Sequence, residues 1–204
     1  MHAVIVSNGF PPSKELLKAE IASASLIIGA DGGGNILLKH GITPHIVVGD
    51  MDSFKKPDAV NFDIIHDPGQ ETNDLEKALS LALQKDVETC TVLGAFGKRM
   101  DHSLKNLSVL KQFNPAFRKL LYKDELLEAF IVKNEYKTVL PVGSIVSLFP
   151  LSGEVKGITT KGLKYSLTNE SLRNGERDGK YNETTAPEIS IRVESGDLVV
   201  FVER

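Results

Sequence analysis

The chain has 204 residues, of which 41% are hydrophobic and 25% are charged, and its 24 Lys and Arg against 27 Asp and Glu give a formal net charge of −3. This length and composition predict a globular protein with a substantial core, built as one large domain or two small ones. The slightly negative charge excludes the basic surface that recruits nucleic acid or anionic membrane, so we expect neither as a partner.

The N-terminus and the cysteine usage indicate where the protein resides. The first residues, MHAVIVSNGF, lack the basic start and long apolar core of a secretion signal, and no apolar run reaches the roughly 18 residues of a membrane span. The single cysteine, Cys90, excludes an internal disulfide and lies in the apolar stretch TCTVLG, as expected of a buried thiol. We therefore expect a cytoplasmic protein.

Four short apolar runs predict buried strands in the first half of the chain, at 3–7 (AVIVS), 26–30 (LIIGA), 45–50 (HIVVGD) and 89–95 (TCTVLGA). Helical patterns begin after Asn73 and after Asp101. The apolar residues at helical spacing are Leu75, Ala78, Leu79 and Ala82 in the first pattern, and Leu104, Leu107, Leu110 and Phe113 in the second. Strands alternating with helices predict a mainly parallel, doubly wound α/β sheet.

The pattern changes from about Tyr122 onward. LLEAFIVKNEYKTVLPVGSIVSLFPL and EISIRVESGDLVVFVE are rich in β-branched and aromatic residues and contain turn signals at KNE, PVG and ESGD. This half predicts a smaller all-β sandwich, with a barrel as the alternative. The polar stretch 168–188 is predicted to form a long loop. The expected domains are 1–122 and 123–204.

Polar side chains follow the predicted strands of the first half, and one opens the helix after Asn73. They are Asp31, Asp50, Asp52, Asp74, Arg99, Asp101 and His102. Ligands of an open α/β sheet bind beyond the carboxyl ends of its strands, so these groups are expected to converge on one site. In an extended backbone, Asp50 and Asp52 would point to the same side and repel by roughly 4 kcal/mol, which a cation would offset. Clustered carboxylates favour Mg²⁺, and no Cys or His pair at zinc spacing is present.

Each acid also has a purely structural interpretation. Asp74 lies in the first turn of a helix with Asn73 as its N-cap and Glu76 completing a capping box, where a negative charge is favourable. Asp101 fits an N-cap of the next helix, and Asp50 and Asp52 fit solvated loop acids. The functional interpretation depends on their convergence.

The segment DGGGN, residues 31–35, complements the acids. Its three glycines let the backbone approach a ligand closely, and the following residues look helical, so free N–H groups would face a phosphate. The segment is neither a dinucleotide fingerprint nor a Walker A loop. Arg99 adds a planar cation suited to phosphate oxygens, with a surface arginine as the alternative, and Lys98 is interpreted as plain surface. Together these features predict a site for a magnesium–nucleotide complex.

Four segments in order resemble the successive motifs of the thiamine pyrophosphokinase family: GADGGGNILLKHGITPHIVVGDMDS, GQETNDLEKAL, GAFGKRMDHSLKNLSVL and GLKYSL. The resemblance covers nearly the whole chain. It implies an ATP- and Mg²⁺-binding α/β domain, a thiamine-binding β-sandwich and a homodimer with active sites between protomers. The implied reaction transfers the pyrophosphoryl group of ATP to the hydroxyl of thiamine, giving thiamine diphosphate and AMP.

The resemblance also implies roles for individual residues. Metal ligands would be Asp31, Asp50, Asp52 and Asp74. Catalytic residues would be Asp50, Asp52, Asp74, Arg99 and Asp101, with Arg99 on the triphosphate and Asp101 orienting the thiamine hydroxyl or accepting its proton. Further binding residues would be Asp31, Gly32, Gly33, Asn35, Gln70, Arg99, His102, Asn106, Asn182 and Glu183.

Two positions depart from the family pattern. Asn73 replaces the usual threonine before Asp74, and Tyr181 replaces the serine of a Ser-Asn-Glu motif whose serine lies in the thiamine pocket. The change at Tyr181 leaves open a related pyrophosphokinase with a different alcohol acceptor. A sensor that binds magnesium–nucleotide without turnover is the other alternative.

Overall fold

The computed structural model describes residues 1–204 and divides into two compact units, 1–125 and 126–204. The predicted boundary at residues 122/123 falls inside the last strand of the first unit, β6 (Lys119–Lys123). This strand pairs in parallel with β5 (Thr89–Leu93), so it continues the α/β sheet. None of the helices has the length and hydrophobicity needed to span a membrane.

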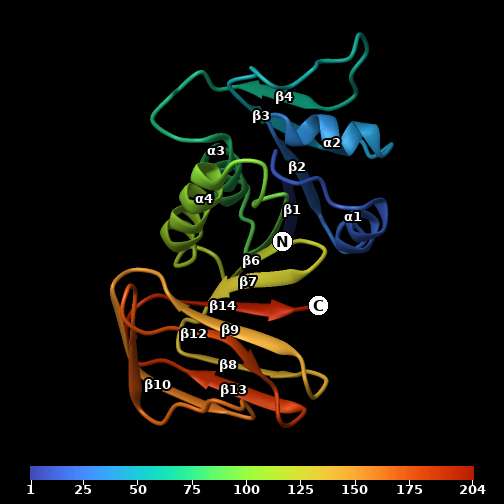
Figure 1. Ribbon diagram of the computed structural model, residues 1–204. Coiled ribbons are helices and arrows are strands. Elements are labelled where there is room, and N and C mark those ends of the chain that lie inside the picture. Colours follow the sequence, from blue (N-terminus) through green and yellow to red (C-terminus); the bar gives the residue numbers. More distant parts are fainter. The chain divides into compact units, whose positions relative to one another are not determined.

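The first unit contains a parallel sheet in the order β6-β5-β1-β2-β3-β4 (Figure 1). Its remaining strands are β1 (His2–Val6), β2 (Leu26–Ala30), β3 (Ile46–Gly49) and β4 (Asp63–His66). The predicted strands β1, β2, β3 and β5 lie within two residues of their expected bounds. The order in which strands are added to the sheet reverses at β1, because β2 pairs with one edge of β1 and β5 pairs with the other. Such a switch point is where open α/β sheets bind ligands.

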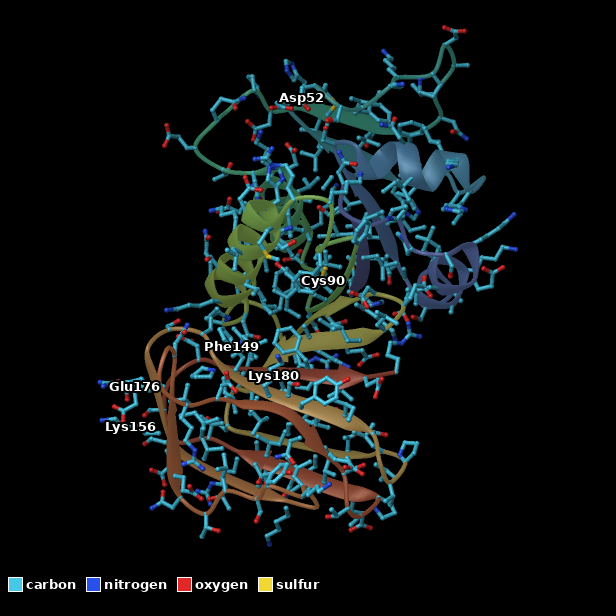
Figure 2. All side chains as sticks on the ribbon, viewed as in Figure 1. Asp52, Cys90, Phe149, Lys156, Glu176 and Lys180 are labelled. Carbon is cyan, nitrogen blue, oxygen red and sulfur yellow. The ribbon has the colours of Figure 1, made fainter.

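Helices cover both faces of this sheet (Figure 1). They are α1 (Lys14–Ile21), α2 (Gly33–Lys39), α3 (Asp74–Gln84) and α4 (Met100–Phe113). On one face, α1 and α2 pack on the strands through a core that includes Val4, Val6, Leu17 and Leu37. On the other face, α3 buries the four apolar residues expected of it. Cys90 is buried inside this unit (Figure 2). The doubly wound arrangement predicted from the sequence is confirmed.

The second unit is a sandwich of two antiparallel sheets. One sheet has the order β12-β9-β14-β7 and the other β11-β10-β13-β8. The strands are β7 (Leu127–Ile131), β8 (Glu135–Val139), β9 (Ile145–Pro150), β10 (Glu154–Lys161), β11 (Glu170–Arg173), β12 (Gly179–Glu183), β13 (Glu188–Arg192) and β14 (Leu198–Glu203). Both sheets contribute to one core, with Leu148 and Val200 from the first and Ile158 and Ile191 from the second. The predicted sandwich is confirmed.

The predicted long loop at 168–188 is wrong. This segment contains β11 and β12, each at the edge of its sheet, and ends at the first residue of β13. An edge strand pairs on one side only, and these two are largely polar. In β11 only Leu172 is a buried apolar residue, and in β12 the buried residue is Asn182. Their hydrophobic alternation is therefore too weak to be recognised from the sequence.

Candidate active site

A cleft of about 290 Å³ lies in the first unit at the carboxyl ends of its strands. Its walls come from the segments that follow β1, β2, β3 and β5 and from the first turns of α3 and α4. The charged residues that line the cleft include Asp31, Asp52, Asp74, Lys98 and Arg99. The arrangement follows the rule that places ligands beyond the strand ends, at the switch point of the sheet.

Three carboxylates from separate elements meet beside this cleft. Asp31 follows β2, Asp50 follows β3, and Asp74 is the first residue of α3. Each offers one carboxylate oxygen, and these oxygens all lie within 4.8 Å of one another. Three oxygen ligands at this spacing, two of them partly exposed, form a donor set that suits a hard divalent cation. The structure therefore brings together three of the four predicted metal ligands.

Asp52 lies outside this cluster, because the backbone turns between it and Asp50. Met51 has a φ of 64°, and the N–H of Asp52 donates to Oδ1 of Asp50 at 3.2 Å. The Asp52 carboxylate accepts a hydrogen bond from Oγ of Ser53, at the surface of the unit (Figure 2). The expectation that extended backbone points both carboxylates to the same side is wrong. Asp52 lines the cleft, and its role as a metal ligand stays a prediction.

Asp31 is the buried member of the cluster, with 2% of its surface exposed. Its Oδ2 accepts from the N–H of Ser53 and its Oδ1 from the N–H of Phe54, both at 3.1 Å. These bonds anchor the loop after β3 against the end of β2. Burial raises the pKa of Asp31 above its usual value, although the backbone donors act in the opposite direction. Burial therefore makes the ionised form of Asp31 less favourable, and a bound cation would stabilise that form.

Asp74 is placed by the start of α3. Asn73 caps the helix, and its side chain and that of Glu76 form the predicted capping box, which is confirmed. Burial and the nearby carboxylates of Asp31 and Asp50 raise the pKa of Asp74. By contrast, the N–H of Asp52 and the side-chain amide of Gln70 lower the pKa of Asp50. Nε2 of Gln70 lies 3.2 Å from Oδ2 of Asp50, so this predicted site residue contacts the cluster.

Two basic residues, Lys98 and Arg99, also line the cleft. Lys98 follows β5 in a left-handed conformation (φ 55°), and its Nζ donates to Oδ1 of Asn8 at 2.9 Å. Arg99 is the N-cap of α4, and its exposed guanidinium forms an ion pair with Asp101, with Nε 3.0 Å from Oδ1. Asp101 is therefore not the helix N-cap, which corrects its structural interpretation. The arginine holds the pKa of Asp101 at about 2.

The side-chain amides of Asn106 and Asn73 connect α4, the loop after β5 and the start of α3. Nδ2 of Asn106 donates to the carbonyl of Ala95 at 2.6 Å, and its Oδ1 accepts from Nδ2 of Asn73 at 3.1 Å. The cap of α3, next to Asp74, is in this way tied to the loop that carries Lys98. Asn106 and His102 both line the cleft, as their predicted binding roles require.

Two family models match the chain. The model described as "Thiamin pyrophosphokinase, catalytic domain" matches residues 17–121, and that described as "Thiamin pyrophosphokinase, vitamin B1 binding domain" matches residues 131–198. The chain belongs to the thiamin pyrophosphokinase family. The first match contains the acid cluster and most of the cleft, and the second lies within the sandwich.

Named relatives and solved structures agree with this family. Thiamin pyrophosphokinase 1 of Caenorhabditis elegans is 26% identical over 190 residues, covering 86% of this chain and 78% of the relative. Thiamine pyrophosphokinase of Bacillus subtilis is 29% identical over 160 residues, covering 71% and 72%. The crystal structure of the Bacillus subtilis protein has a TM-score of 0.86 at 24% identity, covering 100% of this chain and 99% of that one. The yeast structure has a TM-score of 0.84 at 16% identity, covering 99% and 86%.

The glycine segment of this thiamin pyrophosphokinase family chain has a packing role. A Cβ on Gly33 would lie 1.8 Å from the carbonyl oxygen of Val6, so only glycine allows α2 to approach the end of β1 this closely. A Cβ on Gly32 would meet the amide of Asn8 at 2.4 Å. The amide of Asn35 is bonded at both ends to the 53–55 loop. Phosphate binding by Gly32, Gly33 and Asn35 stays a prediction.

The predicted binding residues of the sandwich hold loops together. Asn182 is buried, and its side chain makes hydrogen bonds to both the N–H and the carbonyl of Tyr165 and accepts from the N–H of Glu183. Glu183 forms an ion pair with Lys164 at 3.2 Å. Tyr181 is 69% exposed with a φ of 59°. Ligand binding by Asn182 and Glu183 stays a prediction.

Sequence reasoning missed several residues of the site. Ser7 and Asn8 follow β1 and line the cleft, and the strand-end rule is the only signal that could have identified them. Lys98 was interpreted as plain surface but lines the cleft and contacts Asn8. Lys77, one turn after Asp74, is buried next to the acid cluster. Only its i,i+3 spacing from Asp74 hinted at this contact.

Proposed function

We propose that this chain transfers the pyrophosphoryl unit of ATP to the hydroxyl of thiamine, giving thiamine diphosphate and AMP. The observation that carries the proposal is the convergence of Asp31, Asp50 and Asp74, with one carboxylate oxygen of each within 4.8 Å of the others, beside a cleft that Lys98 and Arg99 also line. Acidic and basic side chains at one cleft suit a polyphosphate bound together with a divalent cation. Membership of the family supports ATP and thiamine as the two substrates.

We assign Asp31, Asp50 and Asp74 as the residues that hold Mg²⁺. When bound, Mg²⁺ neutralises phosphate charge and helps to orient the triphosphate. The carboxylates fit this cation because all three offer oxygen ligands and no Cys or His lies among them. Gln70 keeps Asp50 oriented through its 3.2 Å contact, and the two N–H bonds to Asp31 do the same for that carboxylate.

In the proposed reaction, the hydroxyethyl oxygen of thiamine forms a bond to the β-phosphorus of ATP. The bond from that phosphorus to the oxygen bridging to the α-phosphate breaks, AMP leaves with this oxygen, and the hydroxyl proton of thiamine passes to water. Lys98 and Arg99 are positioned to stabilise the negative charge of the phosphates. Catalysis then consists mainly of positioning and charge neutralisation, as in other phosphoryl transfers.

The sandwich is proposed to bind thiamine, which the match of residues 131–198 supports. The domain bounds 1–122 and 123–204, a homodimer with active sites between protomers, and a cytoplasmic location are further proposals that rest on the family resemblance and the sequence. Sedimentation equilibrium tests the dimer, since the proposal expects twice the mass of the chain.

The direct test is incubation of the purified protein with ATP, Mg²⁺ and thiamine, followed by chromatographic detection of both products. Equal amounts of AMP and thiamine diphosphate are expected, and neither without Mg²⁺. A panel of other primary alcohols tests the change at Tyr181. AMP formed only with another alcohol would favour a related pyrophosphokinase. Magnesium-dependent ATP binding without AMP from any acceptor would favour a sensor.

Asp101 is expected to act through Arg99 and not as a general base. Its pKa of about 2 keeps it ionised across the working pH range. A carboxylate with such a low pKa holds a proton too weakly to be a good general base. Replacing Asp101 with Asn should reduce kcat/KM by roughly tenfold through release of Arg99, while leaving the shape of the pH–rate profile between pH 5 and 9 unchanged. Loss of one limb of the profile in Asp101→Asn would instead identify a base.

A further inference from the structure

Lys77 occupies a position that neither burial nor helix electrostatics favours. It lies in the second turn of α3 with 6% of its surface exposed, whereas lysine is almost never fully buried without a partner. A positive charge near a helix N-terminus is also opposed by the helix dipole. A residue that breaks two local rules is expected to be held by specific partners.

Lys77 has two partners, the backbone after β4 and a carboxylate of the acid cluster. Its Nζ donates to the carbonyl oxygen of Asp67 at 2.8 Å and lies 3.6 Å from Oδ1 of Asp74. Asp67 directly follows β4, and its N–H donates to the carbonyl of Gly49 at 2.8 Å. The ammonium therefore joins α3 to the point where the chain leaves the sheet.

The segment that begins at Asp67 leads to a second ligand of the cluster. Gly69 donates its N–H to the Asp67 side chain, and Gln70 contacts both the carbonyl of Pro68 and Oδ2 of Asp50. Residues 67–72 are exposed, so few packing contacts hold this segment. Its start is held by Lys77 at the Asp67 carbonyl and by the bond of the Asp67 N–H to Gly49, and from there Gln70 reaches Asp50.

We propose that Lys77 is a positioning residue, which holds Asp74 directly and Asp50 through the 67–72 segment in the geometry that binds the divalent cation. The proposal rests on the assignment of these acids as metal ligands under the proposed function. The proposal predicts a direction for the change in cation affinity that charge alone would not give. Removing a positive charge from beside a cation site would by itself tighten cation binding, whereas loss of positioning weakens it.

Lys77→Met tests the proposal, because methionine fills a similar volume without the charge or the donor. Binding of Mn²⁺ alone is measured by electron paramagnetic resonance, without nucleotide or thiamine. We expect at least tenfold weaker binding, together with faster amide hydrogen exchange at Gly69 and Gln70. Lys85→Met, at the exposed end of the same helix, makes the same change in net charge and should keep the original affinity.

Unchanged or tighter Mn²⁺ binding in folded Lys77→Met would overturn the proposal. If Lys77→Met does not fold, Gln70→Ala tests the same connection from the exposed side, where severalfold weaker binding supports the proposal and unchanged binding overturns it. These measurements need no turnover. A chain that bound Mn²⁺ through Lys77-positioned acids but formed no thiamine diphosphate would refute the proposed function and leave this inference intact.

Discussion

Replacing Asp74 with asparagine is expected to lower kcat for thiamine diphosphate formation by about 10³-fold while leaving the cation-free protein as stable as before, or more so. The activity falls because the variant loses one of three carboxylates that hold the cation. A bound divalent cation contributes several kcal/mol to stabilisation of the transition state, and each 1.36 kcal/mol corresponds to a factor of ten in rate.

The stability of the same variant follows from the pKa of Asp74. Burial and the nearby carboxylates of Asp31 and Asp50 raise this pKa, so the folded state binds a proton more tightly than the unfolded state does. The resulting stability is present below the unfolded pKa near 3.8 and is lost as pH rises through the higher folded value. At pH 7 the ionised group therefore opposes folding, and asparagine removes that opposition. Buried Lys77 keeps its hydrogen bond to the Asp67 carbonyl, and the asparagine oxygen can still accept from its Nζ.

Thermal unfolding in EDTA and in excess Mg²⁺ measures both effects. The unmodified protein should gain stability on addition of Mg²⁺ by mass action, and Asp74→Asn should gain much less. Asp58→Asn, an exposed acid outside the cluster, makes the same charge change and should behave like the unmodified protein. Full activity of Asp74→Asn, or the same gain with Mg²⁺, would show that the metal assignment is wrong.

The strand ends of the α/β unit could be predicted from the sequence because a buried parallel strand leaves a continuous apolar run. The same rule predicts that Asp31, Asp50 and Asp74 lie at one edge of the sheet. The divergence of Asp50 and Asp52 could not be predicted. It depends on Met51 at a φ of 64°, a conformation uncommon for any residue other than glycine and not indicated by a methionine.

Burial of individual side chains was the other element that sequence patterns did not resolve. In α4 the expected apolar face included Leu104, which is 58% exposed, whereas Asn106 is buried because Ala95 and Asn73 satisfy its amide. The lysines of the site were missed for a related reason. Whether a lysine ammonium faces only solvent or donates to a protein oxygen depends on tertiary partners, and these come from distant positions, such as the Asp67 carbonyl for Lys77 and the Asn8 amide for Lys98.

Asp31→Asn is expected to lower kcat by about as much as Asp74→Asn does, but to have the opposite effect on the free energy of unfolding. The two oxygens of Asp31 accept from two different N–H groups, those of Ser53 and Phe54. Asparagine offers one acceptor oxygen, and its NH₂ group faces the other N–H. A buried donor without a partner costs roughly 1–3 kcal/mol. Relief of the desolvation that raises the pKa of Asp31 offsets part of this, so we expect a net loss of about 1–2 kcal/mol.

Urea unfolding in EDTA measures this loss, and hydrogen exchange at the Ser53 and Phe54 amides locates it. Ser53→Ala is the matched control, since it keeps both N–H donors and removes a hydroxyl that bonds to Asp52 and also lowers the pKa of Asp31, so its effect should stay within about 0.5 kcal/mol. Opposite stability changes in Asp31→Asn and Asp74→Asn would mean that Asp31 stabilises the fold of the site through its hydrogen bonds, whereas the ionised Asp74 destabilises it. Equal changes in both variants would remove that distinction, and with it the argument that the cluster is arranged to receive a cation.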